Sequence, residues 1–549
     1  MTDVARREQM FPRLTEAQLA RLARVGHRRA FAAGDIIFEQ GESTPGFFVV
    51  LSGTLEVVQP VDGVELPIVV HAPGEFTGEV NMISGRRALV RGRMAQDGEL
   101  LVITPEALRK LVQTDSELSE IFLRAFILRR VALIATPGDT ILIGSSHSAG
   151  TLRLRDFLTR NAHPHTYLDV DKDQSVQALL ERFHIRVEDV PVVICRYDVV
   201  LKNPSNSAVA DCLGLATALE PEAIRDLLVI GAGPAGLAAA VYGASEGLDV
   251  LVLEASAPGG QAGASSKIEN YLGFPTGISG QALAGRAYMQ AQKFGASVAI
   301  ARSAARLHCR QRPYAVELSS GESVKARSIV VATGAEYRKL PLPDLARFEN
   351  LGVYYSATHV EAQVCQGEEA IIVGGGNSAG QAAVFLSGHL RHVHVLVRGP
   401  GLSESMSKYL IRRIEESPNI TLRTRTEVQA LEGAEHLERV RVREATKDRD
   451  EILPVRHLFA MTGAMPNTAW LGGCVALDGK GFVKTGLDLS AAELAAARWP
   501  LLRPPHLLET TLPAMFAVGD VRAGSVKRVA SAVGEGSICV QLVHRALAE

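Results

Sequence analysis

The chain has 549 residues, of which 47% are hydrophobic and 21% charged, a composition typical of a globular protein with roughly three to four domains. Its 58 basic and 60 acidic residues nearly cancel, which argues against nucleic acid or an anionic membrane as a partner. The amino terminus has no signal-peptide pattern and no run of 18 apolar residues occurs, so we expect a cytoplasmic protein. The six cysteines are scattered, without a C-x-x-C pair or metal-ligand spacing, and predict buried free thiols and no metal site.

Residues 31–58 alternate short β-branched and aromatic runs with glycine turns, and further strands follow through Val102. This pattern is typical of a small antiparallel barrel or jelly roll. Three segments resemble the cyclic-nucleotide-binding domain of bacterial catabolite-regulator proteins and kinase regulatory subunits: Gly34-Asp35-Ile36-Ile37-Phe38, Gly41 and Leu51-Ser52-Gly53. The resemblance implies a cyclic-nucleotide-binding-like domain over residues 1–135, ending in a helix.

In that family a short segment binds the cyclic nucleotide through a Gly-Glu pair and an arginine that meets the phosphate. Gly78, Glu79 and Arg87 occupy these places here, and an arginine fork is a strong charge-assisted phosphate ligand. The spacing from Glu79 to Arg87 is slightly short, however, and residues 88–90 offer the phosphate no hydroxyl. Two interpretations stay open: a domain that binds a cyclic nucleotide, and a domain that keeps the fold without the ligand.

An apolar stripe predicts one helix over residues 104–135. In the resembled family such a helix pairs two subunits, which favours a homodimer; the alternative is a helix packed on its own barrel. Arg124, Arg129 and Arg130 are interpreted as its solvated face. No helix-turn-helix pattern follows, which argues against a transcription regulator.

Residues 136–222 resemble a thioredoxin or glutaredoxin fold. We predict strands at 141–143 and 166–171, helices at 152–160 and 175–183, and a hairpin around 196–198. Val190-Pro191 stands where that family has a cis-proline. A redox-active member needs a C-x-x-C at the start of its first helix, but residues 145–148 read Ser-Ser-His-Ser. We therefore expect a docking or spacer module without dithiol exchange, in which His147 is a capping or surface residue.

Residues 226–254 form one complete strand, glycine loop, helix and second strand. Leu227–Ile230 is a short apolar strand, and Gly231, Gly233 and Gly236 give the G-x-G-x-x-G spacing before an alanine-rich helix. These glycines permit a tight turn, a close approach to a pyrophosphate and close packing of helix on strand. The second strand, 250–253, ends at Glu254, whose carboxylate is placed to accept hydrogen bonds from a ribose. The stretch predicts a dinucleotide site.

Further motifs follow in order: Gly259-Gly260-Gln261, Ile268–Pro275, Val331–Gly334 and Phe516–Asp520. Together with the glycine loop they closely resemble the thioredoxin reductases, flavoproteins of the pyridine nucleotide-disulfide class. The resemblance implies a multidomain chain whose carboxyl-terminal α/β part has an FAD domain at 223–340 and 467–549 and an NAD(P)H domain at 341–466. It implies these FAD-binding residues: Gly231, Gly233, Pro234, Ala235, Gly236, Glu254, Gly260, Gln261, Asn270, Thr333, Gly334, Gly519, Asp520, Arg528 and Ala530.

A second fingerprint begins at Ala370 and again reads as strand, loop and helix. Its predicted NAD(P)-binding residues are Gly374, Gly376, Asn377, Ser378, Ala379 and Arg398. Two such units indicate an electron-transfer flavoenzyme with FAD in one domain and a nicotinamide nucleotide in the other. The second strand ends in Arg398 rather than an acid, which favours the 2′-phosphate of NADPH. The further arginines usual in the family are missing, so NADH remains an alternative, with Lys408 as a compensating cation.

Thioredoxin reductases carry a C-x-x-C in the NADPH domain, and the matching positions here are Ser356 and His359. Cys365 lies six residues after His359 and has no partner cysteine nearby in the sequence. The flavin would thus lack the dithiol that passes its electrons to a disulfide. His359 is a candidate proton donor, against the alternative of a structural histidine.

The sequence therefore predicts an FAD-dependent NAD(P)H oxidoreductase that passes electrons from NADPH to an unidentified external acceptor. Ferredoxin-like proteins, quinones, oxygen and small molecules are all open as acceptors, and a cyclic nucleotide is a candidate regulator. One alternative is a cyclic-nucleotide or redox sensor with incidental turnover. Another is a thioredoxin-disulfide reductase, which the residues at 356 and 359 argue against.

Overall fold

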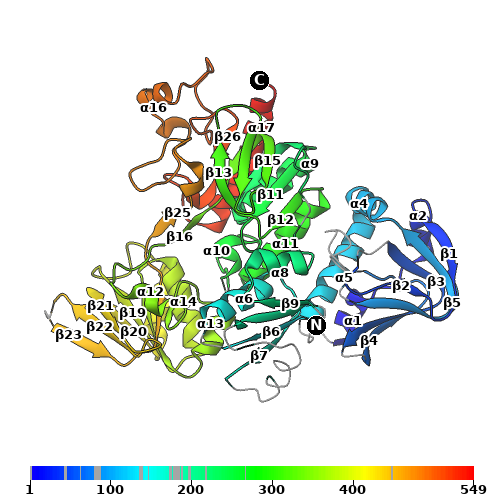
Figure 1. Ribbon diagram of the computed structural model, residues 1–549, viewed down its shortest axis with the longest axis horizontal. Helices are drawn as coiled ribbons and strands as arrows, with labels where there is room; N and C mark the ends of the chain where they lie inside the picture. Colours follow the sequence, from blue (N-terminus) through cyan, green and yellow to red (C-terminus); the bar gives the residue numbers. More distant parts are fainter. Residues whose placement is uncertain are drawn as a thin grey trace.

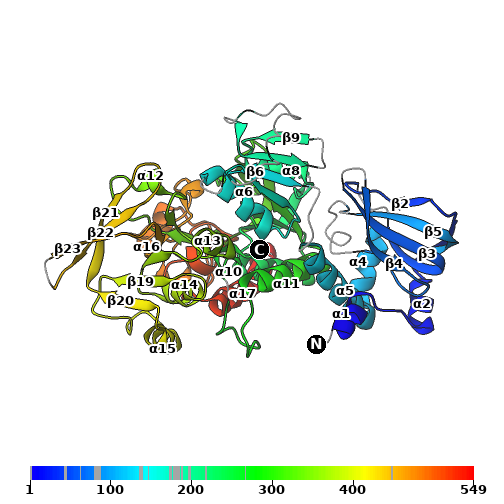
Figure 2. The same ribbon diagram turned by 90° about the horizontal axis from the view of Figure 1, so that it is seen from below.

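The computed structural model describes residues 3–42, 46–61, 64–78, 88, 90–134, 140–145, 148–171, 176, 186, 189–195, 199–216, 219–265, 267–446 and 449–549. Figure 1 shows four lobes: a β-rich lobe at the amino-terminal end, a central α/β module, and two larger α/β domains. The view from below in Figure 2 shows the β-rich lobe and the second of the larger domains at opposite ends of the molecule. Within the described residues, no helix is long and apolar enough to cross a membrane.

The β-rich lobe, called the barrel below, is built on a five-stranded antiparallel sheet, with helices before and after its strands in the chain. Its sheet has the order β1-β5-β3-β4, and β2 also pairs with β5. Phenylalanines and branched residues that alternate along β3 and β5 fill the interior, as period-two patterning requires. The elements are α1 (Asp3–Met10), α2 (Glu16–Leu22), β1 (His27–Phe31), β2 (Ile36–Phe38), β3 (Phe47–Val61), β4 (Val64–His71), β5 (Arg91–Ile103), α4 (Pro105–Thr114) and α5 (Ser116–Ile134).

The helix predicted over 104–135 is two helices, because α4 ends at its C-cap residue Asp115 and α5 begins at Ser116. Phe122 and Phe126 of α5 are fully buried in the barrel core. This part of the helix packs on its own barrel, and the homodimer stays a prediction.

The prediction that the arginines of this helix form a solvated face is wrong for Arg129. It is only 7% exposed, and its guanidinium lies over the rings of Phe11 and Phe76. Its Nε donates to the carbonyl of Met10 and its Nη1 to the carbonyl of Gly78, both at 2.8 Å. Two backbone carbonyls and two aromatic faces replace the water that a charged group otherwise keeps.

The central module is a mixed four-stranded sheet of order β7-β6-β8-β9, in which β6 runs parallel to β7 and antiparallel to β8. The peptide bond Val190–Pro191 before β8 is cis, as the sequence predicted. Of the helix predicted at 175–183 the structure describes only Val176, which is helical and buried, and the turn of the hairpin at 196–198 and His147 lie outside the described residues. The described elements are β6 (Ile141–Gly144), α6 (Ala149–Arg160), β7 (Thr166–Asp169), β8 (Val192–Cys195), β9 (Val199–Lys202) and α8 (Asn206–Cys212).

The first dinucleotide-binding domain is built on the sheet β12-β11-β10-β15-β14-β13, with β26 paired to β15. Its central strands are parallel, and their carboxyl-terminal ends are apolar and buried, because helices cover one face and irregular segments cover the other. The elements are β10 (Ile224–Ile230), α9 (Pro234–Ser245), β11 (Val250–Glu254), α10 (Gly260–Gly263), α11 (Gly280–Lys293), β12 (Ser297–Ile300), β13 (Ala304–His308), β14 (Tyr314–Leu318), β15 (Ser323–Val331), η2 (Ala469–Leu471), η3 (Gly486–Asp488), α16 (Ala491–Ala496), β26 (Met515–Ala517), η4 (Gly519–Val521) and α17 (Val529–Leu547).

The second dinucleotide-binding domain has the parallel sheet β17-β24-β18-β19-β20 and a separate sheet β21-β22-β23. The short antiparallel pair β16 (Ala335–Tyr337) and β25 (Ala464–Pro466) joins the two domains where the chain crosses between them. The elements are α12 (Leu345–Phe348), β17 (Val353–Tyr354), α13 (His359–Val364), β18 (Glu369–Val373), α14 (Asn377–Ser387), β19 (His392–Val397), α15 (Lys408–Glu416), β20 (Ile420–Thr424), β21 (Thr426–Glu432), β22 (Arg439–Glu444), β23 (Arg449–Leu453) and β24 (His457–Ala460).

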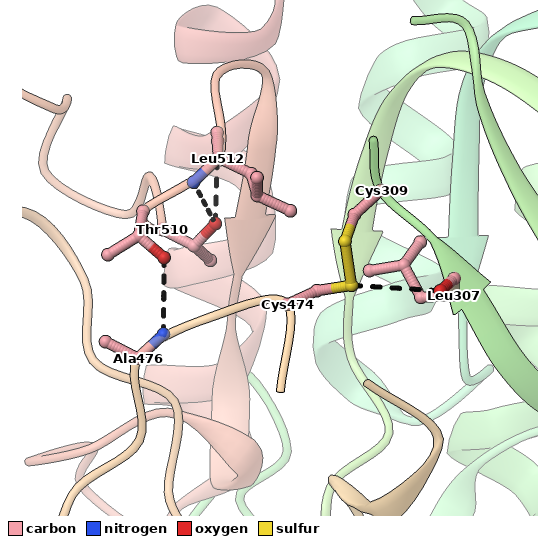
Figure 3. Close-up of a disulfide and its surroundings, with 7 residues drawn as sticks. Leu307, Cys309, Cys474, Ala476, Thr510 and Leu512 are labelled. Atoms are coloured by element: carbon pink, nitrogen blue, oxygen red, sulfur yellow. Dashed lines mark hydrogen bonds between the residues drawn. A yellow bond between two sulfur atoms is a disulfide. The ribbon is translucent and has the colours of Figure 1, made fainter. Parts of the chain in front are cut away.

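Two cysteines form a disulfide, which corrects the prediction that all six are buried free thiols. Cys309 follows β13 and Cys474 follows η2, and their Cα atoms lie 6.2 Å apart although 165 residues separate them in sequence (Figure 3). Both are partly exposed at the edge of the first domain. The prediction failed because the pairing depends on a long-range contact that no local spacing reveals.

Candidate functional site

The first glycine loop joins β10 to α9 and is shaped by close approaches of the backbone. Gly231 has a φ of 104°, and a β-carbon on it would lie 2.4 Å from the carbonyl oxygen of Ala332. A β-carbon on Gly236 would lie 1.8 Å from the carbonyl oxygen of Gly231. Only glycine therefore lets α9 begin this close to the strand.

Gly233 differs from these two glycines, since a β-carbon on it would meet no described atom within 4 Å. It is the N-cap of α9, and Pro234 follows at the first helical position. The first turn of α9, which includes Ala235, is open beside Gly233 in the arrangement by which a helix N-terminus binds phosphate. Gly519 lies close by, because a β-carbon on it would be 2.9 Å from the β-carbon of Ala235. This cradle fits the pyrophosphate of FAD.

Glu254 ends β11 and holds the loop in place. Its Oε2 accepts a hydrogen bond from the N–H of Ala232 at 2.7 Å, and its Oε1 accepts one from the N–H of Ser256 at 2.9 Å. Burial raises the pKa of this carboxyl, while the amide hydrogen bonds and the charge of Arg160 lower it. Each carboxylate oxygen keeps a further lone pair, so the predicted contact with a ribose is compatible with these bonds and stays a prediction.

The second motif, Gly260-Gln261, lies directly against the loop. A β-carbon on Gly260 would lie 3.1 Å from the Cα of Gly233. The exposed Gln261 donates its side-chain amide to the carbonyl of Ala335, at the start of the connection between the domains. The structure thus brings the first two predicted FAD motifs together.

Thr333 and Gly334 lie where β15 leaves the first domain. The hydroxyl of Thr333 donates to the carbonyl of Asn467 at 2.8 Å, and the N–H of Asn467 donates to the carbonyl of Gly334 at 3.1 Å. Asn467 directly follows β25, the strand that returns from the second domain. These two predicted residues therefore tie together the two chain crossings, a role that the motif did not predict.

The remaining predicted FAD residues are less enclosed. Asn270, Arg528 and Ala530 are exposed; Arg528 is the N-cap of α17 and Ala530 lies in its first turn. Asp520, in η4, is half-buried, and burial raises the pKa of its carboxyl. These placements leave their contacts with FAD as predictions.

Glu535 supports this region and was missed from the sequence. Its Oε2 accepts from the N–H of Gly519 at 2.7 Å, and its Oε1 pairs with Arg522 at 2.6 Å. The carboxylate fixes the turn that carries Gly519 beside α9. No motif marks it, because a glutamate in a helix is ordinarily a solvated residue.

The second glycine loop repeats the geometry of the first. A β-carbon on Gly374 would lie 2.4 Å from the carbonyl oxygen of Met461, whereas one on Gly376 would meet no described atom within 4 Å. Gly376 is the N-cap of α14, and Ala379 in the first turn is fully buried. The open turn fits the pyrophosphate of a second dinucleotide.

The segment after β19 folds back over this loop. Asn377 Oδ1 accepts from the N–H of Ser407 at 2.7 Å, and the hydroxyl of Ser405 donates to the carbonyl of Gly375 at 2.7 Å. Arg398 begins the segment and is exposed at the end of the strand, where the ribose of a bound nucleotide is expected.

A second exposed arginine lies beside this segment, because the N–H of Arg425 donates to the carbonyl of Gly399 at 3.0 Å. Arg425 was not predicted from the sequence, because it lies between β20 and β21, outside the motif that begins at Ala370.

A cavity of about 250 Å³ lies at the junction of the two domains. Ser378 of α14 lines it and shares a hydrogen bond with Tyr337 of β16, whose pKa burial raises. The cavity thus lies between the two glycine-loop domains and has mixed polar and apolar walls. Its lining residues are Gln261, Ala264, Ser265, Glu336, Tyr337, Lys339, Tyr355, Ser356, Ala357, Ser378, Gln381, Ala382 and Met461.

The positions of the family dithiol lie at this junction. Ser356 lines the cavity, and its hydroxyl donates to Oε1 of Glu361 at 3.3 Å. His359 is the first residue of α13, and its side chain lies outside the described part of the structure. Burial raises the pKa of Glu361, and the charge of Asp156 in the central module raises it further, while hydrogen bonds from Thr358 lower it.

Cys365 ends α13 and is fully buried. Burial and the nearby Glu361 and Glu368 raise the pKa of its thiol, which keeps it protonated and unreactive. No second thiol accompanies it among the described residues. The junction therefore has no described dithiol.

Of the predicted cyclic-nucleotide residues, Gly78 accepts the hydrogen bond from Arg129, and Glu79 and Arg87 lie outside the described residues. In the described part of the chain, no three His, Cys, Asp or Glu side chains gather in a metal-binding arrangement.

Comparison with known families agrees with this geometry. Residues 225–536 match the family described as pyridine nucleotide-disulphide oxidoreductase, which covers more than half of the 549 residues. The chain belongs to the pyridine nucleotide-disulphide oxidoreductases. Residues 28–115 match the cyclic nucleotide-binding domain family.

Similar proteins are named thioredoxin reductases. NADPH-dependent thioredoxin reductase 3 of Arabidopsis thaliana is 32% identical over 365 residues, which are 63% of this chain and 65% of that protein. Thioredoxin reductase of Mycoplasmopsis pulmonis is 30% identical over 326 residues, which are 58% of this chain and 96% of that protein.

Two solved thioredoxin reductases share the fold of the carboxyl-terminal part. The Lactococcus lactis enzyme in its FR conformation is 23% identical with a TM-score of 0.53, and the T. acidophilum enzyme is 24% identical with a TM-score of 0.52. Each match covers 59% of this chain and 99% of the other. These likenesses show the fold of two dinucleotide-binding domains.

The family match makes this pyridine nucleotide-disulphide oxidoreductase an FAD-dependent NAD(P)H oxidoreductase with FAD and NADPH as its cofactors. The cradles at Gly233 and Gly376 fit the two nucleotides. The predicted cofactors and enzyme class are confirmed.

Proposed function

We propose that this enzyme passes electrons from NADPH through FAD to an external acceptor without a dithiol relay at the domain junction. The observation that carries the proposal is the residue pair Ser356 and His359 at the positions of the family C-x-x-C. A hydroxyl and an imidazole cannot form a disulfide, so neither can store the electron pair.

The neighbouring sulfur does not replace the pair. Cys365 is fully buried and its raised pKa disfavours the thiolate that attacks disulfides. The Cys309–Cys474 disulfide adjoins the core on the face of the sheet that holds Leu228 and Ile230, whereas α9 and α17 pack on the other face. Both observations favour an acceptor that takes electrons from the flavin directly.

The protein residues at the junction bind and orient rather than store electrons. FAD, when bound, supplies the hydride acceptor and the electron donor of the reaction. The open first turns of α9 and α14 would hold the two pyrophosphates, and Arg398 would meet the 2′-phosphate of NADPH. Ser356 keeps its hydroxyl hydrogen-bonded to Glu361 on the cavity wall, where this pair can hold a proton.

An acceptor panel tests the proposal on the full chain loaded with FAD. NADPH should bleach the oxidised flavin band at ~450 nm within roughly seconds under anaerobic stopped-flow conditions. A ferredoxin, a quinone or oxygen should then reoxidise the flavin, and thioredoxin should not. The matched variant Cys365→Ala should give the same acceptor pattern as the wild type, because the buried thiol carries no electrons.

Two outcomes would contradict the proposal. Efficient reduction of thioredoxin by the wild type would show that disulfide reduction does not need the missing cysteines. Failure of the flavin to bleach would instead favour a sensor with incidental turnover.

We further propose that a cyclic nucleotide regulates turnover through the barrel. The match of residues 28–115 to the cyclic nucleotide-binding domain family supports this input. A direct contact supports the connection, because Gln113 of α4 donates to the carbonyl of Lys293 at the end of α11 at 2.9 Å.

A further inference from the structure

The central module reaches the core of both dinucleotide-binding domains through one helix, α6. Phe157 and Leu158 are fully buried in the same cluster as α9, and Leu152 is buried in the core of the second domain. Figure 1 shows α6 between the module's own sheet and the two larger domains, next to α10 and α13. The helix therefore has a fixed place beside the FAD cradle.

Arg160, the last residue of α6, carries a positive charge to that cradle. Its Nη2 donates to the carbonyl of Gly260 at 2.9 Å. Gly260 lies against Gly233, the glycine that borders the open first turn of α9. The neighbouring peptide is held as well, because the N–H of Gly259 donates to the carbonyl of Ala232 at 2.7 Å.

One N–H donor of the guanidinium has no partner in the described part of the chain, although the charge of Arg160 also acts on the buried carboxyl of Glu254. Its Nε is buried and has no hydrogen-bond partner among the described residues. Its acidic neighbour on the helix, Asp156, is 3.6 Å from Nη1, beyond the range of a strong hydrogen bond. An arginine has five N–H donors and is always charged. Its buried donor without a partner, close to a loop that fits a pyrophosphate, therefore suits an anionic ligand such as a phosphate group.

We propose that Arg160 is a binding residue of the FAD site, supplied by the central module, whose charge stabilises the bound diphosphate of FAD. A diphosphate is bound by backbone amides and cations; the first turn of α9 supplies backbone amides, and Arg160 adds a cation beside it. The proposal gives the module, whose sequence has no C-x-x-C, a function in cofactor binding. It does not depend on the identity of the electron acceptor.

The same interface contains two uncharged contacts that serve as controls. Asn161 donates its side-chain amide to the carbonyl of Ser256 at 3.1 Å, and Gln281 donates to the carbonyl of Thr159 at 2.9 Å. They hold the module against the first domain without bringing charge to the cradle. A docking role and a ligand role of Arg160 can therefore be separated.

The test measures the Kd of FAD for the full-length apoprotein by quenching of flavin fluorescence. Arg160→Gln should raise the Kd about tenfold or more, because a charge-assisted contact with a phosphate is lost. Arg160→Lys should recover part of the affinity, since it keeps the charge without the fork. Gln281→Ala should stay within about twofold of the wild type, as one exposed uncharged hydrogen bond contributes little. The wild-type Kd should rise with salt, and less steeply so in Arg160→Gln.

An unchanged Kd in Arg160→Gln would overturn the proposal. So would a Gln281→Ala variant that loses as much affinity as Arg160→Gln while Arg160→Lys recovers none, because that result describes docking alone. If Arg160→Gln does not fold, as judged by circular dichroism, the Arg160→Lys affinity and the salt dependence of the wild type decide.

Discussion

Glu254 ends β11 and Arg398 directly follows β19, and we expect their opposite charges to distinguish the two nucleotides. Glu254 is 8% exposed and already accepts two backbone hydrogen bonds, whereas Arg398 is exposed beside the loop that covers the second cradle. A bare ribose suits the carboxylate and a 2′-phosphate suits the arginine. We therefore expect one residue to set the nucleotide preference of each site.

We expect Arg398→Ala to raise the KM for NADPH about tenfold or more and to leave the KM for NADH within about twofold. A hydrogen bond between charged groups contributes roughly 1.5–3 kcal/mol to binding. NADH has no 2′-phosphate and does not make this bond, so the variant does not weaken its binding. Steady-state kinetics with both nucleotides and one acceptor measure the two values. Arg391→Ala, at the opposite end of β19 and paired with Glu369, is the matched control and should change neither KM. Equal rises for both nucleotides would assign Arg398 a structural role.

The hydrogen-bond partners of Arg129 and Arg160 could not be predicted from the residues around them in the sequence. Both are arginines on helices, and their spacing gives no sign of the carbonyls they meet at Gly78 and Gly260. Those partners come from elements 51 and 100 residues away. The long side chain of an arginine can reach many carbonyl groups, and the packing of the helices and strands decides which of them it contacts.

At the scale of elements, α9 is held by two close contacts with its neighbours. Gly236 brings it against the strand β10, and Gly536 of α17 brings it against the last helix, because a β-carbon on Gly536 would lie 2.2 Å from the carbonyl of Ala235. Gly233 has no such structural contact in the described chain. These contacts give Gly236 a role in folding and predict a role in ligand binding for Gly233.

Gly236→Ala and Gly233→Ala should separate these two roles. Gly236→Ala should lower the free energy of unfolding by about 2 kcal/mol or more, since the new methyl group overlaps a backbone oxygen. Gly233→Ala should leave the stability of the apoprotein within roughly 0.5 kcal/mol and raise the Kd of FAD at least about tenfold, because its methyl group enters the space for the pyrophosphate. Thermal unfolding of the apoprotein and FAD titration measure both. Unimpaired FAD binding by Gly233→Ala would place the pyrophosphate elsewhere.

The elements themselves were largely predictable. The strand, glycine loop and helix at 226–254 and again at 370–397 follow from local periodicity and loop chemistry, and the structure has both. The break between α4 and α5 at Asp115 was missed, because the apolar stripe continues across it. Apolar periodicity indicates the buried face of a helix and does not show where one helix ends and the next begins.

At the scale of the whole molecule, α11 connects three parts of the chain. Its last residue, Lys293, accepts the hydrogen bond from Gln113 of the barrel, and Gln281 in its first turn bonds to Thr159 of the central module. Met289 of α11 packs against the barrel core. A conformational change in the barrel can therefore act directly on α11, a helix of the FAD domain.

If the barrel regulates turnover, cyclic AMP or cyclic GMP should change the rate of NADPH oxidation by the full chain. Gln113→Ala should reduce that change by about twofold or more while keeping the basal rate, because one exposed hydrogen bond contributes roughly 0.5–1.5 kcal/mol. Gln541→Ala, which removes an exposed amide contact to Glu246 inside the first domain, is the control. Calorimetry without heat for either nucleotide, together with unchanged rates, would remove the regulatory role.

Short segments of the sequence were enough to predict the order of the domains' motifs, the two dinucleotide cradles, a preference for NADPH from Arg398 and the lack of the family dithiol at Ser356 and His359. These are properties of short segments, whose chemistry depends on spacing along the chain. The folded chain was needed to reveal the Cys309–Cys474 disulfide, the burial of Arg129 and the hydrogen bond from Arg160 to Gly260 beside the first glycine loop. Each depends on two segments that are distant in sequence, and their meeting is set by the packing of whole elements, which no local pattern encodes.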